Sequence, residues 1–131
     1  MRWEEVFAVL LVCHVAGDFL LQTDWQALNK RGGLTRGNRN GRRALFSHVF
    51  VYTLVFVPAV IWVATETTAL ALALLPVVFI PHLVQDDGTV LMAWNRTVKR
   101  SSSTPGDLLF MAIDQSFHVV VLFGTALLAV A

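Results

Sequence analysis

The sequence predicts an all-α, polytopic membrane protein in which four transmembrane helices form one compact bundle. The chain has 131 residues, of which 56% are hydrophobic and only 15% are charged, whereas a soluble domain carries roughly 25% charged residues. The charged residues are also gathered in two stretches, which leaves four apolar segments. A chain of this length has room for a single domain, so we expect residues 1–131 to form one unit.

The four predicted helices are about residues 3–22, 44–64, 68–86 and 107–130. Crossing ~30 Å of hydrocarbon takes ~20 helical residues, and the first and third segments are near the lower limit because polar residues crowd one end of each. Glu4 and Glu5 make the start of the first segment acidic, which is not typical of a cleaved signal peptide. We therefore expect this segment to be retained as a helix.

The connections between the helices differ in kind. Residues 25–43 are rich in Gly, Asn and Arg and predict a flexible or partly helical loop, residues 65–67 predict a tight turn, and residues 87–104 form a polar stretch with a Ser run near its end. Thr104 is expected to cap the last helix and Pro105 to occupy its first position.

Basic residues and tryptophans predict the orientation. All but one of the ten lysines and arginines lie in the two longer connections, and the positive-inside rule places both connections in the cytoplasm and both termini outside. Trp3 and Trp62 would mark the outer interface, and Trp25 and Trp94 the inner one. Flanking apolar spans make membrane lipid the expected partner of the basic loops, and no nucleic acid is expected.

Each of the four histidines has a polar partner four residues away on an apolar segment. The pairs are His14 and Asp18, His48 and Tyr52, His82 and Asp86, and Asp114 and His118. Residues at this spacing share a helix face, and ionisable groups inside a membrane are costly and mark functional sites. The predicted topology places all four pairs in the cytoplasmic half of the bilayer, so inward-facing helices would gather them in one pocket.

This set of side chains favours a divalent metal ion. Neutral imidazole and carboxylate are the usual ligands of zinc, manganese, iron and nickel, with zinc favoured here. The predicted metal ligands are His14, Asp18, His82, Asp86 and His118. Asp114 would act as general base, while His48 and Tyr52 would position a substrate or donate a proton. A packing role for Tyr52 fits the sequence equally well.

Several of these motifs together resemble a known family. They are His14 to Gln22 (HVAGDFLLQ), Asn29-Lys30, Ser47-His48, Pro81-His82 and Asp114 to His118 (DQSFH). In this combination they are similar to small bacterial membrane proteins known as domain of unknown function 3307. The resemblance covers nearly the whole chain and implies the four-helix topology, the His/Asp set and a multi-pass place in the bacterial cytoplasmic (inner) membrane, but it implies no activity. A looser similarity of motif style links the chain to membrane-bound metal-dependent hydrolases.

Three functions remain open from the sequence. The first is a metal-dependent hydrolase that acts on a lipid-like or headgroup substrate at the cytoplasmic side. The second is a proton or metal-ion transport protein, because Asp and His chains also relay protons; the paucity of polar groups in the outer half counts against a through path. The third is a structural or assembly subunit in which the polar groups only specify helix packing. A small bundle is also compatible with a homo-oligomer.

Overall fold

The computed structural model describes residues 1–66 and 68–130, which contain helices and no strand. In chain order the elements are α1 (Trp3–Val15), the π-helical turn η1 (Ala16–Leu20), α2 (Asp24–Asn29), α3 (Arg39–Ala64), α4 (Thr68–Asp87), α5 (Thr89–Thr97) and α6 (Leu108–Ala129). The predicted all-α class is confirmed. Of the predicted turn at 65–67, Thr67 lies outside the described residues.

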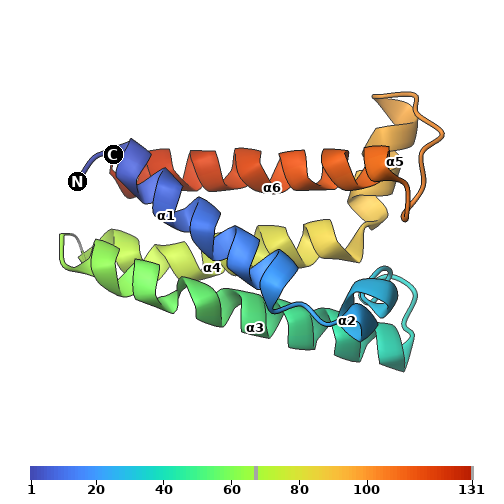
Figure 1. The fold of residues 1–131 in the computed structure, drawn as a ribbon, viewed down its shortest axis with the longest axis horizontal. Helices are drawn as coiled ribbons and strands as arrows, with labels where there is room; N and C mark the ends of the chain where they lie inside the picture. The colour runs from blue at the N-terminus through green and yellow to red at the C-terminus, as the bar shows by residue number, and fades with distance from the viewer. Residues whose placement is uncertain (67, 131) are drawn as a thin grey trace.

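The four longest helices close into a ring. α1 contacts α3, α3 contacts α4, α4 contacts α6, and α6 returns to α1. Figure 1 shows that they run alternately in opposite directions, so that both chain ends lie at one end of the bundle and the short helices α2 and α5 lie at the other. This arrangement brings the second half of α1, the first half of α3, the end of α4 and the first half of α6 to the same level.

The interior of the ring is divided into an apolar half and a polar half. The core next to the chain ends is apolar and includes Val6, Leu10, Phe56, Leu74, Val78, Leu122 and Ala126. The buried histidines and aspartates lie on the parts of the same helices, and on η1, that are nearer in the chain to α2 and α5. A second apolar cluster, of Leu91, Phe110 and Ile113, packs α5 against α6. The polar groups thus lie between the apolar core and the end of the bundle that carries α2 and α5.

The first helix is shorter than predicted. α1 ends at Val15, where a π-helical turn replaces the expected continuation to Gln22, with the Leu21 N–H donating to the Ala16 carbonyl at 3.0 Å. Single π turns within helices occur frequently at functional sites, and this one carries Asp18. Thr23 and Gln26 then form a reciprocal capping box that begins α2.

Three further features of the helices differ from the prediction. α3 begins at Arg39 instead of residue 44, because the Asn38 side chain caps it by accepting from the Asn40 N–H at 3.0 Å. α5 occupies half of the stretch predicted as a polar connection. The N-cap of α6 is Asp107, not Thr104. The Asp107 carboxylate accepts instead from the Thr104 N–H at 2.6 Å, which orders the turn before the helix.

The predicted count of four transmembrane helices is not confirmed. Among the described residues, two helices, α3 and α6, are long and apolar enough to cross a membrane. α1 has 13 residues and, at ~1.5 Å per residue, reaches only about two thirds of the ~30 Å hydrocarbon layer.

Candidate metal centre and adjoining pocket

All eight residues of the four predicted pairs lie in one connected buried network. They come from α1 (His14), η1 (Asp18), α3 (His48 and Tyr52), α4 (His82 and Asp86) and α6 (Asp114 and His118), and every one of them is at least nine-tenths buried. Burial of so many ionisable groups is costly unless they compensate one another or bind a cation, so their mutual contacts define what the site can do.

Four of these residues form what we call the central cluster: Asp18, His48, His82 and Asp86. Each offers one ligand atom, and the four atoms lie within 4.8 Å of one another. The His48 Nε2 atom is 2.9 Å from Asp86 Oδ2 and 3.2 Å from Asp18 Oδ1, and the His82 Nε2 atom is 3.2 Å from Asp86 Oδ2. Two carboxylates and two imidazoles from three different elements therefore converge on one point, and this group could hold a metal ion.

Lys30 places a positive charge at the central cluster. Its Nζ atom donates to Asp86 Oδ2 at 2.8 Å and lies 3.7 Å from Asp18 Oδ1, and its side chain is only 7% exposed. Lys30 is the C-cap residue of α2, so the short helix after the π turn positions it. The two buried carboxylates of the central cluster thus have one resident cation between them.

A chain of hydrogen bonds orients Asp18 from the opposite side. The Gln115 Nε2 atom donates to Asp18 Oδ2 at 2.8 Å, so the Gln115 Oε1 atom is the acceptor that faces the His14 Nε2–H at 2.8 Å. With a neutral imidazole, His14 Nδ1 then accepts from the Tyr52 hydroxyl at 3.0 Å. His14 is therefore not in the central cluster and supports it through Gln115.

Tyr52 is held in place by packing as well as by this hydrogen bond. Its ring stacks on the His82 imidazole with centroids 3.4 Å apart and an angle of 4° between the planes. On the other side Gly17 admits the ring, because a Cβ at Gly17 would lie 2.7 Å from Tyr52 Cδ2. The glycine between His14 and Asp18 thus allows the π turn to approach α3 closely.

His118 and Asp114 form the edge of the network on α6. The His118 Nδ1–H donates to the backbone carbonyl of Asp114 at 2.8 Å, which leaves Nε2 of the neutral ring with a lone pair. This Nε2 lies 3.7 Å from Asp86 Oδ1, and neither atom has a hydrogen-bond partner among the described residues. Two buried acceptors that face each other are unfavourable unless a proton or a cation lies near them, which is the arrangement expected at a cation site.

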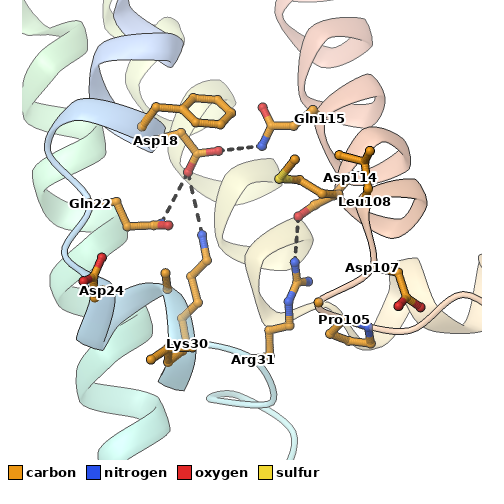
Figure 2. A pocket seen from close by; sticks show the side chains of 15 residues that line it. Asp18, Gln22, Asp24, Lys30, Arg31, Pro105, Asp107, Leu108, Asp114 and Gln115 are labelled. Atoms are coloured by element: carbon orange, nitrogen blue, oxygen red, sulfur yellow. Dashed lines mark hydrogen bonds and ion pairs between the residues drawn. The ribbon is translucent and has the colours of Figure 1, made fainter.

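A pocket of about 640 Å³ adjoins the central cluster. Figure 2 shows Asp18 and Gln115 on one side of it, Lys30 and Arg31 reaching in from the end of α2, and Asp114 and Leu108 on α6. The Arg31 guanidinium donates to Asp114 Oδ2 at 2.9 Å and lies over the Phe110 ring. Because Asp18 belongs to both the central cluster and the pocket wall, a molecule in the pocket would lie next to the cluster.

Neither Lys30 nor Arg31 was among the predicted site residues: both were placed in a basic loop, and Lys30 was noted besides only as part of the Asn29-Lys30 motif of the family resemblance. Two signals pointed to them: buried carboxylates need a compensating cation, and Thr23-x-x-Gln26 predicts a helix whose end leads to Lys30. Asp87, at the end of α4, was not among the predicted site residues either. It is buried and accepts from the Leu34 N–H at 2.8 Å, which fastens the loop after Lys30 to the end of α4.

The comparisons with known proteins agree with the family resemblance and add no activity. Neither the curated proteins nor the solved structures gave a significant match. The similarity of motif style to membrane-bound metal-dependent hydrolases therefore finds no support. A family model described as "Protein of unknown function (DUF3307)" matches residues 6–130. Because this match includes nearly the whole chain, together with the central cluster and the pocket, the protein belongs to the DUF3307 family.

Proposed function

We propose that this protein is a membrane-embedded, divalent-metal-dependent hydrolase that cleaves an ester or phosphoester. The observation that carries the proposal is that Asp18 is shared between a buried group of four candidate metal ligands and the wall of a pocket. A metal site next to a pocket that can hold a substrate is the basic requirement of metal-assisted hydrolysis.

The donor atoms and the negative charge of the central cluster suit a divalent ion. Two imidazoles and two carboxylates are the donor set expected for zinc, with manganese, iron and nickel as alternatives. Within the part of the chain that the structure describes, Asp86 Oδ1 and His118 Nε2 are buried without hydrogen-bond partners, and both atoms could contribute to the same ion. Such an ion would act as a Lewis acid and activate water for attack on the ester.

The remaining residues would orient and serve this centre. The relay from Tyr52 through His14 and Gln115 fixes the Asp18 carboxylate, as hydrogen-bonded outer groups do at metal sites. Asp114 lines the pocket, and its Oδ1 atom has no hydrogen-bond partner in residues 1–66 and 68–130, which suits this carboxylate to accept a proton as general base. Lys30 and Arg31 would hold the negative charge of the substrate.

A place in the membrane fits the surfaces of the two long apolar helices. Only 39% of the apolar window of α3 and 33% of that of α6 is buried, whereas a core helix of a soluble protein is mostly buried. Phe50, Leu54 and Ile61 form an exposed apolar stripe along α3, and three arginines precede it in the same helix. We infer a four-helix protein of the bacterial cytoplasmic membrane, with the pocket at the end that carries the basic residues and with both termini outside.

Metal content and activity of neighbouring variants test this proposal. Detergent-purified wild type should carry about one divalent ion per chain and should hydrolyse p-nitrophenyl esters or phosphoesters. Asp86→Asn should lose the ion and the activity. Asp87→Asn is the matched control, because Asp87 is buried on the same helix but contacts the loop instead of the central cluster. A wild type without metal, or a loaded protein that cleaves none of these substrates, would refute it.

The alternative is proton or metal-ion transport, which the hydrogen-bonded chain from Tyr52 to Asp18 favours. The apolar core between this chain and the termini end of the bundle counts against a continuous path. Proton or zinc flux into proteoliposomes that depends on His14 would reverse the preference.

A further inference from the structure

The pocket beside the central cluster is itself amphipathic. Its inner wall carries charged and amide groups, among them Asp18, Lys30 and Gln115. Four large apolar side chains of the same pocket are exposed and therefore form its rim: Phe19, Leu28, Leu108 and Met111. Leu28 and Leu108 are 83% and 76% exposed. Large apolar groups this exposed around a polar hollow mark an interaction site and not a packed surface.

The charges inside the pocket indicate which polar group it accepts. Three buried carboxylates, Asp18, Asp86 and Asp114, face the cations of Lys30 and Arg31, so with neutral histidines this group has a formal charge of −1. A divalent ion in the central cluster changes the charge to +1. The loaded site therefore attracts an anion, and the metal-free site does not.

Two further carboxylates of the pocket do not change this conclusion. Asp24 and Asp107 are both exposed and lie at the starts of α2 and α6. Negative charge at these positions is compensated by the helix dipole and screened by water. The field at the inner end of the pocket is therefore set by the buried groups.

We propose that the ligand of this pocket is a single phosphate-bearing lipid. Its phosphate end lies against Lys30 and Arg31 next to the metal-loaded central cluster, and its acyl chains lie on the apolar rim formed by η1, α2 and the start of α6. Figure 2 shows Lys30 and Arg31 pointing into the pocket from one side and Leu108 on α6 at another. This inference rests on the proposed function for the metal, and it names the class of substrate.

Binding measured without turnover tests this inference separately from hydrolysis. The probes are a non-hydrolysable dihexanoyl phosphonate lipid, methylphosphonate without acyl chains, and uncharged dihexanoylglycerol, titrated into the zinc-loaded and the metal-free protein. Since burial of each CH₂ group contributes ~0.8 kcal/mol, the phosphonate lipid should bind the loaded protein at least ~10-fold more tightly than methylphosphonate. The phosphonate lipid should also bind the loaded protein more tightly than dihexanoylglycerol. Removal of zinc should reduce this preference for the charged lipid, but not the preference for the lipid over methylphosphonate.

Substitutions at the rim supply the structural control. Leu28→Asp with Leu108→Asp should abolish the advantage of the phosphonate lipid over methylphosphonate. Val90→Asp should not, because Val90 is an exposed apolar residue outside the pocket. Equal affinity for the lipid and methylphosphonate would overturn the lipid assignment, and equal affinity for the lipid and dihexanoylglycerol would overturn the phosphate assignment. Tight lipid binding without any hydrolysis would instead refute the proposed function and leave the ligand class intact.

Discussion

Replacement of Lys30 by methionine should destabilise the metal-free protein strongly and make it dependent on metal. The Lys30 ammonium and the Asp86 carboxylate are 2.8 Å apart, with side chains that are 7% and 1% exposed. Removal of one partner of such a buried pair costs about 3–5 kcal/mol, because the other charge is left uncompensated. A solvent-exposed ion pair contributes only ~0.2–1 kcal/mol. Methionine retains much of the aliphatic chain, so the change isolates the charge.

The assay is thermal unfolding in detergent, followed by circular dichroism, of chelator-treated and zinc-loaded protein. Metal-free Lys30→Met should unfold on the order of 10 °C below the wild type. Zinc should raise its Tm more than that of the wild type, because a divalent ion compensates Asp86 and no ammonium must be displaced. Lys99→Met is the control, since Lys99 is exposed. An unchanged Tm of the metal-free variant, or equal effects of zinc on variant and wild type, would refute the reasoning.

Three further outcomes are expected. Gly17→Ala should destabilise the protein by ~1–3 kcal/mol, because the new Cβ would lie 2.7 Å from the Tyr52 ring, whereas Gly124→Ala, whose Cβ would meet no atom of the described residues within 4 Å, should be neutral or slightly stabilising in the same thermal assay. Tyr52→Phe should cost ~1–3 kcal/mol, since it leaves the buried His14 Nδ1 without its donor; a wild-type Tm would contradict the relay. Chelation of the wild type should lower its Tm and abolish ester hydrolysis, and readdition of zinc should restore both.

The spacing of the four pairs predicted that their side chains would gather in one site. It did not predict which of them form the central cluster and which only support it. Pairs four residues apart share a helix face, and alternating helix directions bring the four faces to one level, so the convergence of His48, His82 and Asp86 was predictable. The π turn widens the helix between His14 and Asp18. No spacing pattern signalled it, and it directs His14 to Tyr52 while Asp18 faces the central cluster. The assignment of His14 as a metal ligand consequently stays a prediction.

The surroundings of the site depended on contacts between segments far apart in the chain. Lys30 reaches Asp86 across 56 positions and Arg31 reaches Asp114 across 83. The positive-inside rule already accounts for a basic loop next to an apolar span. For this reason the pairing of these two cations with buried carboxylates was not predicted. The short helix α5 was missed, and α2 was anticipated only as part of a flexible or partly helical loop, because hydropathy identifies spans and not the short amphipathic helices between them.

In the proposed function, Asp18, His48, His82 and Asp86 together hold one divalent ion. Anomalous diffraction at the zinc absorption edge from crystals of the zinc-loaded protein tests it most directly. We expect a single anomalous peak among these four side chains, with the Lys30 ammonium moved away from Asp86. A peak elsewhere, or zinc-loaded crystals in which Lys30 still occupies the space between the two carboxylates without any peak, would contradict it.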